Sequence, residues 1–200
     1  MTEPQYFELG LTGSPDGALR DPIAELNLEV LEAYIPTVPG LRGRWHALSA
    51  AARARLAACP FLLVDAGFAH PELWARLPSV GVHEALPLRT LLANRSTLST
   101  PLLRRVLLLA WHMARANRTN ARIALGMSGL CARAVAGWRL ADLEALAERR
   151  PAWIRPRWDQ HGDFWCAWLT AAASESPQSL ERFHLWGLQA LAAEVRRQSD

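Results

Sequence analysis

The sequence predicts an all-α fold, a compact array of short helices with room for one short strand in its N-terminal half. Apolar residues recur at spacings of three and four along most of the chain, whereas alternation with period two is never sustained. Half of the 200 residues are apolar, which is enough for one sizeable core. Asn117, Gly126, Gly137 and Pro151 divide the middle of the chain into pieces too short to bury a face alone.

The first half reads as helical but irregular. Residues 1–22 mix glycine, proline, serine and aspartate, which predicts a loosely ordered arm. An amphipathic helix follows over 23–34 and ends before Pro36, and a linker then leads to a helix that Ser49 caps. The apolar run 59–68 suits a short strand or a buried helical turn about equally well.

The second half carries the clearest helix signals. Thr100 offers a cap oxygen before Pro101, which predicts a helix start, and Ser128 offers another. The helices expected here span 101–116, 120–125, 128–136, 140–149 and 162–173, with a last one starting near Pro177. A short helix is also expected at 71–77, around Trp74. The predicted organisation is thus an arm (1–22), an irregular helical part (23–100) and a helical part (101–200), packed as one globular unit.

Charge is concentrated in residues 101–158, which hold eleven arginines against three acids, a net charge of +8 in a chain that totals +3. Between the flanking arginines, only Ser128 and Arg133 on the expected 128–136 helix could read bases, which favours contact with phosphates or with an acidic protein. The predicted nucleic-acid or partner-binding residues are Arg115, Arg118, Arg122, Arg149, Arg150, Arg155 and Arg157.

Nine tryptophans are present, and three of them are candidates for binding a partner. Trp153 and Trp158 lie in the proline-broken end of the basic segment, where pinning of a loop to the core explains them better than partner binding, which is the preferred functional role. Trp186 and Leu185 lie off the apolar stripe of the last helix. Such additional apolar surface predicts a homodimer or a hetero-complex.

No combination of residues indicates an enzyme. The chain has no P-loop, no G-x-S-x-G and no H-E-x-x-H, so we expect no catalytic residue and no cofactor. His161, Asp163 and Cys166 could approach a metal, but helix capping and core packing explain them better, so no metal is expected either. Cysteines without C-x-x-C spacing, the lack of a secretory signal and the lack of a membrane-length apolar run favour the cytoplasm.

Several features from Leu107 onward occur in a particular order: Ala121 before the Leu-Gly-Met of 125–127, LADLEALAE at 140–148, RWDQH at 157–161, and a last helix around His184. In this order and spacing the C-terminal half resembles the flagellar master regulator subunit FlhD and its relatives in mobile elements. The resemblance implies an all-helical dimeric subunit that works in a complex with a DNA-binding partner. The family's dimer-linking cysteine would fall at Ile154, so a covalent dimer is not implied.

The function expected from these observations is that of a transcriptional regulatory or adaptor subunit, with a regulatory protein as partner and DNA contacted only through phosphates. The alternative is a helical adaptor or scaffold of a bacterial secretion apparatus that binds no nucleic acid. No membrane contact is expected in either case.

Overall fold

The computed structural model describes residues 21–68, 74, 98–150, 153–174 and 176–197. The arm expected at 1–22 falls outside this part of the chain except for its last two residues, and so does the helix expected at 71–77 except for Trp74. The elements in order are α1 (Pro22–Tyr34), the 3-10 turn η1 (Ile35–Thr37), α2 (Arg42–Ala47), α3 (Ala50–Ala57), β1 (Val64–Asp65), α5 (Thr100–Ala116), α6 (Arg118–Leu125), α7 (Gly129–Gly137), α8 (Leu140–Arg149), β2 (Arg155–Pro156), α9 (Gly162–Ala173) and α10 (Pro177–Arg197).

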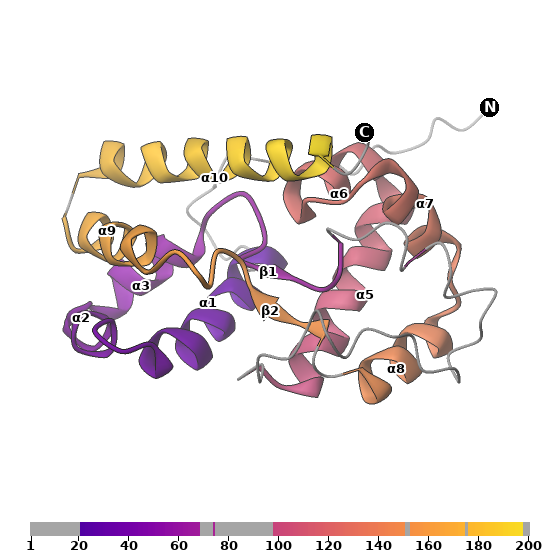
Figure 1. Cartoon of the computed structure of the whole chain (residues 1–200), viewed down its shortest axis with the longest axis horizontal. Coiled ribbons are helices and arrows are strands. Elements are labelled where there is room, and N and C mark those ends of the chain that lie inside the picture. Colours follow the sequence, from indigo (N-terminus) through magenta and orange to yellow (C-terminus); the bar gives the residue numbers. More distant parts are fainter. Residues whose placement is uncertain (1–20, 69–73, 75–97, 151–152, 175, 198–200) are drawn as a thin grey trace, which may run out of the picture.

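These elements form two groups of helices joined by α10 (Figure 1). In one group α5 is central and packs against α6, α7 and α8. In the other, α1 packs against α3, η1 contacts α1 and α2, and α9 lies against α2 and α3. The short β1–β2 ribbon lies between the groups, and α10 runs across both, touching α9 and α6. The described part is therefore predominantly helical, as the sequence predicts.

Within the described residues, a two-stranded ribbon contains part of segment 59–68, which the sequence left open between a strand and a helical turn. Val64 pairs with Pro156 and Asp65 with Arg155 in antiparallel register. The predicted short strand thus exists as β1, and the proline-broken segment near residue 155, expected only to be extended, supplies its partner. Elsewhere in 59–68 the backbone is irregular, and buried Asn27 serves as its hydrogen-bond partner: its amide donates to the carbonyls of Ala57 and Phe61, and its oxygen accepts from Leu63 N–H.

Side-chain caps explain most helix starts. Asp21, Ser49, Asn117 and Ser128 each accept a backbone N–H from the first turn of the helix that follows, at 2.9–3.1 Å. For α5 the predicted cap was wrong: the hydroxyl of Ser99, one residue before Thr100, accepts from Leu102 N–H. A second difference is α2, which occupies part of the stretch expected to be a linker. It is anchored there by the buried indole of Trp45.

One hydrophobic cluster contains side chains from α1, α3, β1, α5–α8, α9 and α10, so the core is continuous across residue 100. Its largest fully buried members include Trp74, Trp165 and Trp168. The indole N–H of Trp74 donates to Gly67 O at 3.0 Å, which ties this residue to the end of the β1 segment. Most tryptophans therefore contribute to the core rather than to the surface.

The close packing of α10 requires two glycines. A Cβ on Gly187 would lie 2.1 Å from a ring carbon of Phe61, so only glycine lets α10 approach this closely. Gly126, which ends α6 with φ +61°, would place a Cβ 2.8 Å from Leu191 and 3.0 Å from the guanidinium of Arg157. The backbones of α6 and α10 thus meet around a buried arginine.

Candidate partner-binding surface

The arginines of the basic segment divide into those paired within the chain and those facing solvent. Five of them form ion pairs with carboxylates in the described residues: Arg104 with Glu148, Arg105 with Glu29, Arg139 with Asp142, Arg155 with Asp65 and Arg157 with Glu194. A charge count from sequence therefore overstates the cationic surface that remains for a partner.

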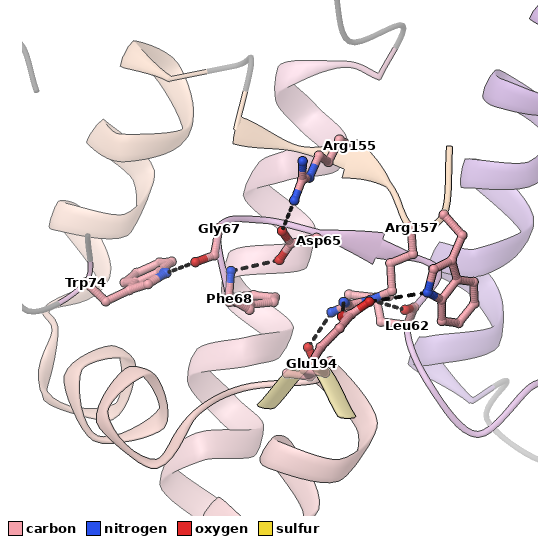
Figure 2. Close-up of polar contacts among 10 residues, drawn as sticks. Leu62, Asp65, Gly67, Phe68, Trp74, Arg155, Arg157 and Glu194 are labelled. Atoms are coloured by element: carbon pink, nitrogen blue, oxygen red, sulfur yellow. Dashed lines mark hydrogen bonds and ion pairs between the residues drawn. The ribbon is translucent and has the colours of Figure 1, made fainter. Parts of the chain in front are cut away.

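Arg157 is a structural arginine. Only 3% of it is exposed, and its guanidinium donates to Leu62 O at 3.0 Å, to Leu125 O at 2.6 Å and to the Glu194 carboxylate at 3.1 Å (Figure 2). Its own N–H donates to Leu63 O at 2.8 Å. Because all these acceptors are internal, the prediction that Arg157 contacts a phosphate or partner was wrong.

Arg155 is turned toward the chain as well. Its guanidinium lies 3.4 Å from the carboxylate of Asp65, which is buried and also accepts the N–H of Phe68 (Figure 2). A buried carboxylate requires such partners, since desolvation penalises an isolated charge. The guanidinium of Arg155 thus compensates an acid of the N-terminal half, while 41% of its side chain is exposed, so its role as a partner contact stays a prediction.

The three tryptophans predicted to bind a partner differ in how far they are buried. Trp153 is buried among the aromatic rings near Trp74, so its predicted role in partner binding was wrong. Trp158 is half-buried, with a left-handed backbone (φ 53°) and an indole N–H donated to Glu194. Trp186 stays exposed on α10, next to the still more exposed Leu185.

The exposed arginines of this region lie on α5, α6 and α7, three helices that pack against one another. Arg115 lies over the ring of Trp111, with its guanidinium carbon 4.7 Å from the ring centroid. Arg118 and Arg122 are exposed one turn apart on α6, and Arg133 is exposed on α7; no acidic residue occurs anywhere in 101–141. Arg118, Arg122 and Arg133 take part in none of the five ion pairs described above, and all three are exposed to solvent.

Two exposed aliphatic side chains accompany these arginines. Ile123 of α6 is 56% exposed and Leu130 of α7 is 55% exposed. We call the set of Arg118, Arg122, Ile123, Leu130 and Arg133 the α6–α7 surface. The sequence prediction missed Ile123 and Leu130, although both lie off the buried stripes of their helices, which a helical wheel would have revealed.

Arg149 is exposed at the end of α8, and Arg150 is partly buried, with its backbone N–H closing the helix on Leu146 O. Both lie at the end of α8, which packs against α5 and has no extensive contact with α6 or α7. The seven predicted arginines therefore do not form one surface.

Two of the three cysteines are buried. Burial raises the pKa of the Cys59 thiol to about 12 and raises that of Cys131 well above its usual value, so both stay protonated at neutral pH. His161 stands at the N-terminal cap position of α9 without a capping side-chain bond, and Cys166 is partly buried. Among residues whose placement is described, no three histidine, cysteine or acidic side chains cluster as metal ligands.

Comparison of the chain with protein-family models, with curated proteins and with solved structures finds no match. Within the described ranges, no helix has the length and apolar character needed to cross a membrane.

Proposed function

We propose that this chain is a regulatory or adaptor subunit in transcription, similar to FlhD, which works in the cytoplasm through a protein partner and contacts DNA only through phosphates. The observation that carries the proposal is the α6–α7 surface. Its arginines lack acidic neighbours along the chain, and its two exposed aliphatic residues suit a protein interface better than a solvated face.

The chemistry of this surface separates affinity from specificity. Arginines at the surface neutralise phosphates and release counterions, a contribution that does not depend on base sequence. The exposed face of α7 offers Arg133 but few other side chains able to read base edges. Sequence selection is therefore assigned to the partner.

The alternative, a scaffold or adaptor of a secretion apparatus without nucleic acid, is supported by a different observation. Arg155 and Arg157, two of the arginines expected to contact phosphate, are committed to carboxylates of the chain itself. What remains exposed at Ile123 and Leu130 suits a protein partner.

Salt-dependent DNA binding distinguishes the two. Fluorescence anisotropy with two duplexes of unrelated sequence should give similar, weak affinities that decrease steeply with salt. The double variant Arg118→Gln/Arg122→Gln should weaken both equally. It should also reduce the slope of log K against log salt by about 0.9 for each phosphate that the two arginines neutralise in the unaltered protein.

The control is Arg42→Gln/Arg44→Gln, which removes the same charge from exposed positions of α2, at the other end of the molecule (Figure 1). It should leave the slope nearly unchanged. If the two double variants behave alike, DNA attraction reflects net charge only; if the unaltered protein binds no DNA at low salt, the scaffold function replaces the regulatory one.

A further inference from the structure

A groove of about 590 Å³ lies between α9 and α10, away from the α6–α7 surface. Its volume lies within the range of sites that hold small organic molecules. Its walls combine three aromatic rings with a small number of polar side chains, and its residues come from both helices, including Phe164, Thr170, Ser179, Arg182, Phe183 and Trp186.

The aromatic end of the groove is rigid. Phe164 stacks on Trp186 with ring centroids 4.5 Å apart and an interplanar angle of 27°, and Phe183 meets Phe164 edge-on at 5.9 Å. Trp158 meets both Trp186 and Phe164 edge-on, with ring centroids 5.1 Å apart in each case. Trp186 nevertheless remains 41% exposed, so a fixed indole offers surface to a further flat ring.

The polar end of the groove carries one formal charge. Arg182 is the only ionisable side chain among the described lining residues. The hydroxyl of Thr170 is already engaged, since it donates to Cys166 O and accepts from Arg44. Among the described residues, neither the Ser179 hydroxyl nor the Arg182 guanidinium has a side-chain hydrogen bond, so both can serve a ligand.

The two free groups lie on the same face of α10 as the exposed indole. Ser179, Arg182 and Trp186 are spaced three and four residues apart, which places them in a row along the helix. Ser179 also lies in the first turn of α10, where the helix dipole favours an anion.

We propose that the groove binds a small aromatic carboxylic acid. The ring packs on Trp186 at the aromatic end, and the carboxylate lies at Ser179 and Arg182, whose guanidinium geometry suits two parallel hydrogen bonds. This site is independent of the proposed function, because it uses neither the α6–α7 surface nor DNA.

The test uses 3-phenylpropionate and its uncharged amide, which share ring and chain length and differ in charge. Binding is followed by NMR through the tryptophan indole N–H signals, with that of Trp186 assigned from its loss in Trp186→Phe. The acid should shift the Trp186 signal and reach half-saturation at or below about 1 mM, which corresponds to about 0.4 kcal/mol per non-hydrogen ligand atom. The amide should bind about three- to fivefold more weakly.

Substitution of the arginine separates recognition of charge from non-specific apolar contact. Arg182→Gln should remove the preference for the acid over the amide, whereas Arg196→Gln, an equal charge change at the far end of α10, should retain it. Matching indole spectra of the free variants establish that both are folded.

Three results would overturn the proposal: acid and amide binding equally to the unaltered protein, a preference that survives Arg182→Gln, or no shift of the Trp186 signal up to about 10 mM probe, well above the weakest expected constant. A Trp186 signal that responds to protein concentration but not to probe assigns the groove to a second copy of the chain, which also refutes a small-molecule site.

Discussion

Replacing Arg157 by methionine should destabilise the protein strongly, because a side chain of similar length remains but every donor is removed. Leu62 O and Leu125 O are buried acceptors that then lack a partner, each at a cost of about 1–3 kcal/mol. Glu194 keeps its bond from Trp158, and its side chain is 24% exposed, so water can hydrate it. Removal of one member of a largely buried ion pair costs about 3–5 kcal/mol in total, and we expect a value in this range.

Thermal unfolding followed by circular dichroism measures this destabilisation. For a protein of this size, about 3–5 kcal/mol corresponds to a decrease in Tm of about 6 to 20 °C. Arg157→Lys should be destabilised less, because it keeps the charge, but one ammonium group cannot reproduce three directed N–H bonds. Arg149→Gln, at an exposed position, is the control and should change stability by less than about 0.5 kcal/mol. A decrease for Arg157→Met no larger than for this control would refute the assignment of Arg157 as an internal cross-link.

Three further outcomes are expected. Gly187→Ala should lower the free energy of unfolding by about 1–3 kcal/mol, since its Cβ would overlap Phe61, whereas Gly43→Ala, with open space around its Cβ, should not destabilise in urea titrations. Burial lowers the pKa of His184 below its ordinary 6.5, so the unfolded chain takes up the proton first and stability should decrease as pH falls from 7 through the lowered pKa; a His184→Gln variant with the same pH profile would contradict this. Light scattering should show a dimer or a complex with a partner. If the protein is a dimer, Leu185→Glu should convert it to a monomer. A purified protein that is strictly monomeric without a partner would refute the homodimer.

The helices were predictable because their signals are local. Ser128 caps α7 as expected, and Gly126 ends α6 in the left-handed conformation that only a glycine adopts without strain. The α2 helix was missed because it is six residues long and its main stabilisation is the burial of Trp45 in distant parts of the core, which no local pattern reveals.

The candidate surface was predictable only in part, because the fate of an arginine depends on what the fold brings to it. Arg122 and Arg157 look alike in sequence, each in a basic stretch. Arg122 is exposed on α6. Arg157 instead binds the carboxylate of Glu194, 37 residues further along the chain, and the carbonyl of Leu62, 95 residues before it. Charge counts omit this long-range pairing. The groove between α9 and α10 could not be predicted from the sequence either, because it too depends on how the fold places two helices.

The position of α9 has a consequence for the order in which the protein can form during synthesis. Two of the helices made early, α2 and α3, are covered by α9. Arg55 donates to a carbonyl 117 residues later in the chain, and Tyr34 donates to one 125 residues later. The ribosome thus releases the first third of the molecule with one apolar side uncovered, and α5–α8 can assemble before that side is closed. Contacts of such sequence separation slow folding and lengthen the interval in which a nascent chain can aggregate. A chaperone holding the nascent chain until residue 173 has emerged would therefore act at the vulnerable stage of biogenesis.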